Sequence, residues 1–391
     1  MRKSKLIFLL LLLLAPAQIR AQNWISLSGY VSDMQSLYHV PQDQWLWENT
    51  VQNRLNLEFW PTPWLNGSVQ MRNRFISGNT ILKFPGYGEG LKGDMGLVDL
   101  SWASEGSLGD SAGYVLTSTI DRLWLQFTFG NLEVKAGRQR INWGQTFVWN
   151  PNDIFNSYSY FEVDYPERPG SDAIRLSYYT GYSSTIELAA KLDSASKVTA
   201  AAYFRFNTLG FDVQLLGGIY RETDLVLGTG WSGNLGSAAL RGELSYFRDL
   251  DNFSDTSGYL MTSLGVDYIF SNSLMLQAEA LYSAFARDYN IHSFLQFYSG
   301  TLDVKSLGFT EWAFFGSISY PITPLINGSF ASIWYPQWKG CYLGPTFDFS
   351  LNPNLDLSLI FQYFTARFDS PSGPSERQNN TFSFLRLKWS F

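Results

Sequence analysis

The sequence predicts an all-β protein, a transmembrane antiparallel β-barrel of about 18 strands with an inserted constriction loop. Three observations lead to this prediction. Segments of alternating apolar and polar residues recur along the chain, tight turns alternate with longer connectors, and the chain ends on an aromatic residue. Alternation places every second side chain on the same face of a strand. In a membrane-spanning barrel, that pattern puts apolar side chains in lipid and polar side chains in the lumen.

Residues 1–21 are predicted to be a secretory signal peptide. Three basic residues precede an apolar run over 6–14, and the small residue Ala21 offers a cleavage point. The run is too short for a membrane-spanning helix, which needs about 20 apolar residues. The expected organisation is therefore a signal peptide, 1–21, followed by a single outer-membrane β-barrel, 22–391.

The composition favours a barrel over a helical membrane protein. Aromatic residues make up 17% of the chain and charged residues only 16%, while the mean hydropathy is −0.10. A barrel meets lipid with alternate residues only, so it needs no long apolar stretch. The single cysteine, Cys341, excludes an intrachain disulfide. The net charge of −6 argues against a nucleic-acid partner, and neither a cofactor nor a metal site is indicated.

Strand-length segments with this alternation follow one another from residue 25 to the end of the chain. Their number is even, which places both ends of the barrel sequence on the same side of the membrane. In order, the segments cover 25–34, 54–59, 66–75, 122–129, 132–141, 173–179, 185–192, 197–206, 211–220, 225–232, 240–247, 263–270, 274–283, 312–320, 326–335, 343–351, 355–364 and 385–391.

Tight turns and connectors of variable length alternate between these strands. The tight turns are rich in Pro, Gly, Asn and Ser, as in NPN at 352–354 and GN at 130–131. Short turns at one end and long loops at the other are typical of barrels in the outer membrane of Gram-negative bacteria. We therefore expect this location, with outer-membrane lipid as a partner. The long connectors cover 77–118, 142–171, 249–258, 286–310 and 366–379.

The last strand is expected to pair with the first, because lipid supplies no hydrogen-bond partner for a free sheet edge. Residues 377–391 should pair with the strand near 24–34. The terminal Phe391 resembles the signal that directs outer-membrane proteins to the barrel assembly machinery, which would be a partner during insertion. The alternation near the C-terminus predicts that Leu357, Leu359 and Phe361 face lipid, with Asp356 and Ser358 facing the lumen.

The polar faces of the early strands are rich in arginine, whereas those of the later strands lean acidic, as with Glu243 and Glu279. Arginine stays charged at any relevant pH, and its forked donors suit carboxylate, sulfate or phosphate groups. Facing walls of opposite charge orient dipolar or anionic solutes. The predicted lumen and selectivity residues are Arg54, Arg72, Arg74, Arg122, Arg138, Arg140, Arg175 and Arg205.

The connector at 142–171 is predicted to fold into the lumen as the constriction loop. It is dense in aromatic residues, which would be poorly placed in bulk water, and its carboxylates would then lie near the arginine wall. An extracellular lid or a partner-binding surface is the alternative for its outer half. The predicted constriction residues are Trp143, Trp149, Asn150, Asp153, Glu162, Asp164 and Glu167.

The start of this connector carries a recognisable motif. The stretch GRQRINWG at 137–144, with NPND at 150–153, resembles a motif of porin-like outer-membrane families, including the alginate-export family and related uncharacterised porins. The match covers about a tenth of the chain. The resemblance implies a substrate-selective channel, without identifying the substrate. The positions that match the motif are Arg138, Arg140, Trp143, Asn150 and Asp153.

The sequence thus predicts passive, partly selective diffusion of small polar or anionic solutes through a narrowed lumen. One alternative is a plugged barrel that acts as a surface anchor or as an accessory in secretion or assembly. A second is an outer-membrane hydrolase. The chain has only two histidines, His39 and His292, both in predicted loops, so no catalytic residues are assigned and no enzyme activity is expected. The oligomeric state stays open.

Overall fold

The computed structural model describes residues 24–40, 44–84, 86–92, 96–158, 160–254, 257–287, 291–294, 297, 303–369 and 375–391. The expected signal peptide lies outside the described residues. No helix in the described part of the chain is both long and apolar enough to cross a membrane.

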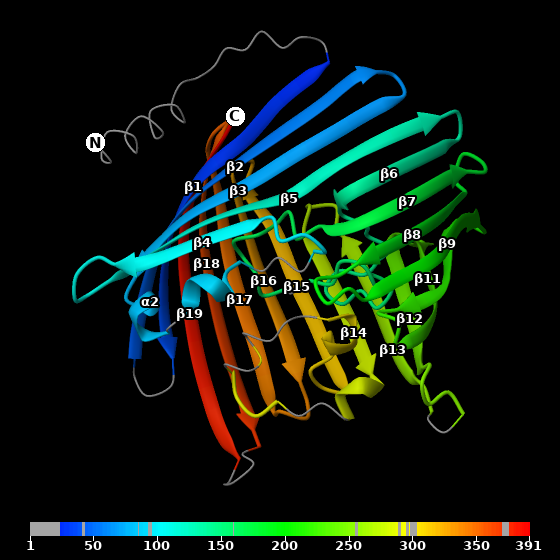
Figure 1. Ribbon diagram of the computed structural model, residues 1–391. Coiled ribbons are helices and arrows are strands. Elements are labelled where there is room, and N and C mark those ends of the chain that lie inside the picture. The colour runs from blue at the N-terminus through cyan, green and yellow to red at the C-terminus, as the bar shows by residue number, and fades with distance from the viewer. Residues whose placement is uncertain are drawn as a thin grey trace.

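The structure is a closed antiparallel β-barrel, as the alternation predicts (Figure 1). Each of the eighteen predicted segments overlaps a strand of the barrel, and none extends more than two residues beyond it. The strands are β1 (Ile25–Val40), β2 (Gln44–Thr62), β3 (Leu65–Gly78), β4 (Ser101–Ser107), β5 (Gly113–Phe129), β6 (Leu132–Gln139), β7 (Ser171–Tyr179), β8 (Thr185–Leu192), β9 (Val198–Thr208), β10 (Phe211–Tyr220), β11 (Asp224–Leu235), β12 (Ala238–Asp249), β13 (Tyr259–Ile269), β14 (Met275–Ser283), β15 (Trp312–Thr323), β16 (Ile326–Tyr335), β17 (Gly340–Asn352), β18 (Leu355–Phe368) and β19 (Glu376–Ser390). Short helices, α2 (Thr80–Lys83), α3 (Tyr87–Gly90), η1 (Ala284–Arg287) and η2 (Val304–Ser306), lie in the longer connectors.

The barrel closes between its first and last strands, and this prediction is confirmed. β1 and β19 are antiparallel, with pairs from Tyr30 opposite Ser390 to His39 opposite Thr381. The terminal Phe391 exchanges two backbone hydrogen bonds with Gly29, each 3.0 Å long. Both edges of the sheet are thereby satisfied, as a barrel in lipid requires.

The connector expected at 77–118 is more structured than the sequence indicates. It contains α2, α3, the strand β4 and the first part of β5. β3 pairs directly with β5, so β4 stands outside the closed ring of 18 strands and pairs with β5 alone among the strands. Ser and Gly interrupt the apolar pattern of β4, SWASEGS, and this masks its strand character in the sequence.

The two faces of the wall alternate as predicted. On β18, the side chains of Leu359 and Phe361 are 42% and 40% exposed, whereas those of Ser358 and Gln362 are 4% and 3% exposed. The exposed residues face outward, and the buried ones face a lumen that loops fill. The expected outward and inward positions on this strand are therefore confirmed.

The wall varies in height around the ring. β2 and β5 have 19 and 17 residues, whereas β6, β7 and β8 have 8, 9 and 8. The segment 96–100 crosses the loop-side ends of these short strands. Its Gly96 forms a β-bridge with Asp193 after β8, and the N–H of Val98 donates to Asp172 on β7 at 3.1 Å. This segment thus covers the loop-side ends of β7 and β8, while β4 lies beside the first part of β5.

Candidate functional site: the lumen and its inserted loop

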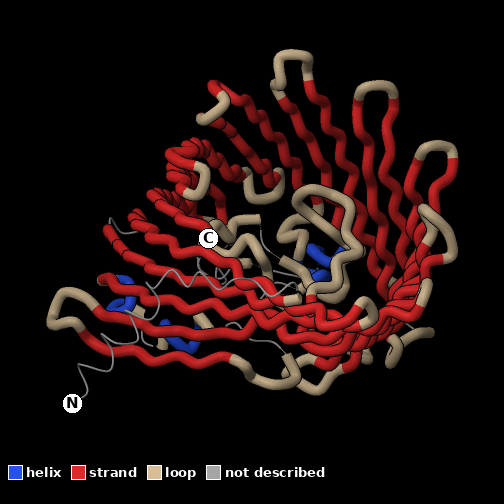
Figure 2. Tube along the Cα trace, turned by 90° about the horizontal axis from the view of Figure 1, so that it is seen from above, coloured by secondary structure: helices blue, strands red, loops and turns tan. Residues whose placement is uncertain are grey.

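The connector between β6 and β7, residues 140–170, lies inside the barrel and is called the inserted loop below. Viewed along the barrel, loops occupy the interior of the ring of strands (Figure 2). The side chains of Trp149, Phe155 and Phe161 are 4%, 2% and 9% exposed, as expected for aromatic residues that leave water. The inserted loop therefore reaches the lumen, as its composition predicts.

Glu243, on β12, anchors the first half of the inserted loop. Its carboxylate accepts hydrogen bonds from the backbone N–H groups of Gln145, Thr146 (2.9 Å) and Asn152 (2.9 Å). It also accepts one from the Thr146 hydroxyl at 3.0 Å. The Glu243 side chain is 0% exposed, so these four donors replace the water that a carboxylate would otherwise hold.

Glu279, on β14, anchors the next residues of the loop in the same way. Its Oε2 accepts from the backbone N–H groups of Phe147 (2.7 Å) and Val148 (3.0 Å), and its Oε1 from that of Trp149 (2.9 Å). The Ser263 hydroxyl donates to Oε1 at 2.8 Å. Period-two alternation places both glutamates on the lumen face, but nothing in the sequence indicates that they bind loop backbone.

Trp143 fixes the entry of the loop against the neighbouring wall. Its indole N–H donates to Glu187 at 2.9 Å, and its ring stacks on Tyr203 at 5.0 Å between centroids. The side-chain amide of Gln214 donates to the Trp143 carbonyl at 3.0 Å. Strands β8, β9 and β10 thus hold this predicted constriction residue.

The second half of the inserted loop crosses to the arginine wall. Asp164 lies 3.5 Å from Nη1 of Arg74, and Glu167 lies 3.8 Å from Nη1 of Arg54. Arg122 donates to the carbonyls of Glu167 and Arg168 at 2.8 and 2.9 Å. The structure thus brings the predicted loop carboxylates Asp164 and Glu167 to this wall, together with three of the predicted arginines.

Arg54 belongs to a buried ion pair. Its Nη1 donates to Asp121 Oδ2 at 2.7 Å, and the two side chains are 1% and 3% exposed. The pairing of β3 and β5 shifts by one residue at Asp121, since Gln70 faces Arg122 and Met71 faces Ile120. A β-bulge of this kind lets two successive side chains point inward. Regular alternation would have directed Asp121 outward, so the sequence did not reveal this partner.

Arg138 holds the segment 96–100 in place. It binds Asp172 with two parallel hydrogen bonds of 2.7 and 2.8 Å, and its Nη2 also donates to the carbonyl of Val98 at 2.5 Å. A side chain at Gly96 would collide with Arg138, because its Cβ would lie 2.1 Å from Nη2. The motif position Arg138 therefore supports the rim of the barrel.

Arg72 lies against the inserted loop. Its guanidinium lies 3.6 Å from the centroid of the Tyr165 ring, and its buried Nη1 has no hydrogen-bond partner. Nearby, Arg74 binds Thr117 and the carbonyl of Leu91 at 3.1 and 2.8 Å.

The remaining predicted arginines lie elsewhere along the lumen. Arg175 is 4.0 Å from Glu187, and Arg205 is exposed near the short-turn end of β9. Arg140 is half-buried at the start of the inserted loop.

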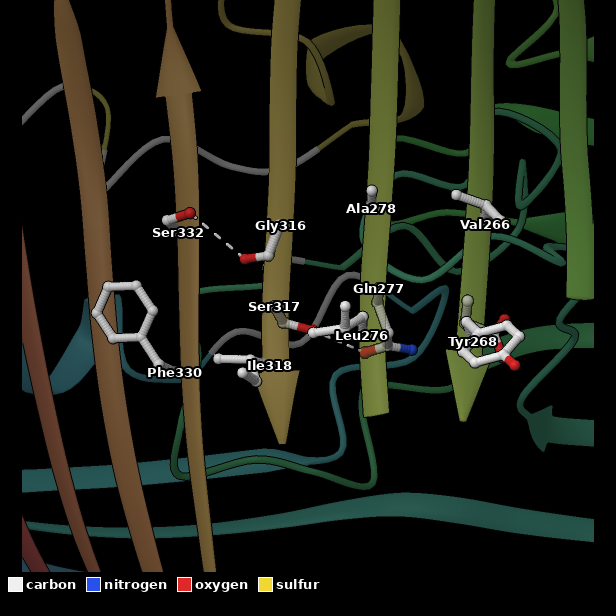
Figure 3. A pocket seen from close by; sticks show the side chains of 11 residues that line it. Val266, Tyr268, Leu276, Gln277, Ala278, Gly316, Ser317, Ile318, Phe330 and Ser332 are labelled. Carbon is white, nitrogen blue, oxygen red and sulfur yellow. Dashed lines mark hydrogen bonds between the residues drawn. The ribbon is translucent and has the colours of Figure 1, made fainter. Parts of the chain in front are cut away.

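A cavity of about 340 Å³ lies between the inserted loop and the arginine wall. Its basic lining comprises Arg72, Arg74, Lys92, Arg138, Lys191 and Arg221. Its acidic lining comprises Asp121, Glu162, Asp172, Asp193 and Asp303. A separate hollow of about 400 Å³ lies at β13–β16, where Val266, Leu276, Ile318 and Phe330 border it (Figure 3). Those four side chains are 38–40% exposed on the outer wall, so the hollow is not part of the lumen.

Two loop carboxylates have raised pKa values. Glu162 lines the cavity, where desolvation by the surrounding protein raises its pKa to about 7. The charge of Asp164 acts in the same direction, while Arg72 and Arg74 oppose it. Burial also raises the pKa of Asp153 to about 7, against the opposing charges of Arg140 and Lys191. Both groups therefore change charge near neutral pH.

The other half of the lumen holds an aromatic core that the sequence did not reveal. Phe294 and Phe297, from the connector between β14 and β15, pack on Phe364 with ring centroids 4.9 Å apart in each case. Phe161 of the inserted loop joins Phe297 at 5.3 Å. Inward residues were expected to be polar, yet here the inward face of the wall is apolar at its loop side, as at Phe364, Phe368, Phe382 and Phe384.

Among the described residues, no group of three or more His, Cys, Asp or Glu side chains is arranged to hold a metal ion. The lumen offers hydrogen-bond donors, fixed charges and apolar surface.

Comparison with known proteins identifies the fold alone. No protein-family model matches the chain, and no curated protein matches it. The alginate-export resemblance therefore remains a prediction. Solved outer-membrane porin structures do match: Pseudomonas aeruginosa OccK11 (OpdR) has 10% sequence identity and a TM-score of 0.56, with 94% of this chain and 96% of that chain covered.

Two further structures give the same result. Acinetobacter baumannii OccAB2 has 9% identity and a TM-score of 0.55, with 94% and 98% of the two chains covered. Pseudomonas aeruginosa OccD3 (OpdP) has 10% identity and a TM-score of 0.52, with 94% and 92% covered. The chain thus has the fold of a porin-like 18-stranded β-barrel.

Proposed function

We propose that this protein is a porin-like channel in the bacterial outer membrane, through which small polar or anionic solutes diffuse passively and with partial selectivity. The observation that carries the proposal is the cavity between the inserted loop and the arginine wall, whose basic lining includes Arg72, Arg74 and Arg138. Guanidinium groups in the lining of a cavity attract oxyanions and donate hydrogen bonds to them. The loop carboxylates Glu162 and Asp164 keep that binding weak enough for release.

Single-channel recording in planar bilayers tests this function. The refolded chain without residues 1–21 should give discrete, reproducible conductance steps. Heat-denatured protein in the same detergent is the control for leakage. Folded protein that produces no steps would contradict the channel.

A plugged barrel is the second candidate, and one observation favours it. The inserted loop binds strands around much of the ring, from Glu243 and Glu279 on one wall to Arg54 and Arg386 on the other. A loop held on so many sides can seal the lumen. Absence of conductance in the bilayer experiment would favour this candidate.

The selectivity should depend on pH because Glu162 lies in the lumen with a pKa raised to about 7. An acid of that pKa loses its charge as the pH falls from 8 to 6, which leaves the arginine wall less compensated. We expect anion preference to increase over that range. Reversal potentials under a salt gradient measure the effect, and Glu162→Gln should flatten it. A pH response that Glu162→Gln leaves intact would assign the titration to another group.

The membrane location predicts the effect of a charge on the outer wall. Leu359 is outward on β18 and 42% exposed. Leu359→Arg should destabilise the barrel by about 2–4 kcal/mol if the site is near the bilayer midplane. Urea unfolding in lipid vesicles, followed by tryptophan fluorescence, measures the difference. Leu359→Phe is the matched control and should change stability far less, while an equally small effect of Leu359→Arg would contradict the location.

A further inference from the structure

The outer face of β1, β2, β3 and β5 carries polar side chains in the middle of an apolar wall. On β2, for example, the inward residues Gln52 and Arg54 are 4% and 1% exposed, so Asn53 between them faces outward. Apolar residues flank it on the same face, with Val51 39% exposed on one side and Leu55 on the other. We call this group the outward polar patch, and it comprises Asp33, Gln35, Asn49, Asn53, Asn73 and Ser118.

Three members of the patch form a straight row across adjacent strands. Asn53 on β2 is directly opposite Asn73 on β3, and Asn73 is directly opposite Ser118 on β5. The Ser118 hydroxyl donates to Asn73 Oδ1 at 2.8 Å. Beside the row, Asn49 and Gln35 donate to the carboxylate of Asp33 at 2.5 and 3.3 Å.

The row lies well inside the apolar band. Asn53 is six residues from Phe59, which lies at the short-turn end of β2 beside Trp60. At a rise of ~3.3 Å per residue and a strand tilt of ~45°, this separation is roughly 14 Å along the barrel axis. The lipid-facing band of such barrels is about 25 Å tall, so Asn53 stands near its middle. Headgroups and bulk water do not reach that depth.

Hydrogen bonding within the chain leaves this patch incomplete. The side-chain oxygen of Asn53 is buried and has no hydrogen-bond partner. Its amide nitrogen donates to the backbone carbonyl of Tyr30 at 3.4 Å, so the oxygen alone is left without a partner. On the opposite wall, the outward hydroxyls donate to their own sheet. Thr229 donates to the carbonyl of Gln214 at 3.0 Å, and Thr262 donates to that of Glu243 at 2.8 Å. Polar groups that face lipid are costly unless a partner satisfies them.

We propose that the outward polar patch is the contact surface for a second copy of this chain in the same membrane. Acyl chains offer no donor or acceptor, and a soluble protein does not reach this depth. Side-chain amides both donate and accept, so Asn53, Asn73 and Asn49 on one copy complement the same residues on another. The inference rests on the proposed membrane location and goes beyond the channel function.

Site-specific photo-cross-linking tests the contact. A benzophenone amino acid at Asn73, in intact outer membranes, should yield an adduct of two copies of this chain, identified by mass spectrometry. The same probe at Thr262, on the opposite wall, should yield far less. Equal yields at both positions, no adduct at Asn73, or attachment of Asn73 only to another protein or to lipopolysaccharide would each overturn the proposal.

The mass of the assembly provides an independent measurement. Light scattering coupled to size exclusion, in mild detergent and in lipid nanodiscs, should give at least twice the chain mass for the wild type. The variant Asn53→Leu/Asn73→Leu replaces the outward amides by apolar side chains that pack against acyl chains, so it should give the mass of one chain. The control variant Thr229→Leu/Thr262→Leu should give the same mass as the wild type. A wild-type mass of one chain in both media would overturn the proposal.

Folding and function are checked separately. Heat-modifiable gel mobility shows whether each variant forms the barrel. If the double variant does not fold, the cross-linking experiment alone tests the contact. A monomeric protein with normal conductance would reject the contact and leave the channel intact. Tolerance of Leu359→Arg would instead reject the membrane location.

Discussion

Glu243→Ala combined with Glu279→Ala is expected to raise single-channel conductance severalfold. The two carboxylates accept eight hydrogen bonds, seven of them from the inserted loop, and both side chains are almost fully buried. Each buried donor left without a partner costs about 1–3 kcal/mol. A loop with six unsatisfied backbone N–H groups will leave its dry site for water, which widens the lumen.

The control for this experiment is Glu133→Ala. Glu133 is also an acidic residue of the wall, but it accepts a hydrogen bond from the hydroxyl of Tyr179 on the neighbouring strand, at 3.0 Å. Its replacement should leave the conductance near the wild-type value. The single variants Glu243→Gln and Glu279→Gln keep one acceptor oxygen and should give intermediate values. A double alanine variant that folds but conducts like the wild type would show that these anchors do not set the width of the lumen.

Replacement of Arg72 and Arg175 by glutamine is expected to move the reversal potential toward cation preference. Arg72 borders the cavity, and Arg175 is 21% exposed beside Glu187. In the proposed channel both charges belong to the lumen wall, so their loss lowers the local concentration of anions. The wild type itself should be anion-preferring or weakly selective. Strong cation selectivity of the wild type would contradict the assignment of the arginine wall.

Arg122 and Arg138 are less suitable targets for that measurement. Arg122 donates to two carbonyls of the inserted loop, and Arg138 binds Asp172 and the segment 96–100. Their replacement would move the loop or the rim together with the charge. Arg205→Gln is the better control, because Arg205 is exposed at the short-turn end, away from the cavity. It should shift the potential less than Arg72→Gln.

The strands could be predicted from the sequence because their signal is local. Alternation and turn residues can be recognised within one or two strands, so segments such as 355–364 and 385–391 are predicted as strands from their own residues alone. The closing pair of β1 and β19 follows from the same pattern, since a barrel in lipid leaves no free edge. β4 was missed because its outer face carries Ser104 and Gly106 in place of apolar residues.

The lumen could be predicted only in part, because its contacts join residues far apart in the chain. The sequence showed that the inserted loop is aromatic and that the early strands carry arginine. It did not show that Asp121 points inward at a β-bulge and forms an ion pair with Arg54. Nor did it show the apolar inward face at Phe364 and Phe382, because the prediction assigned the polar residues of each alternating strand to the lumen. These features depend on which loops fill the space.

The anchoring of the inserted loop has a consequence for the order of folding. Phe147 and Glu279 are separated by 132 positions, and Val163 and Arg386 by 223. Contacts of such long range form slowly, because the intervening chain must be ordered first. The loop can find Arg386 only once the final strand has been made. The nascent barrel should thus close around a hydrated interior, with the loop docking as a later kinetic phase.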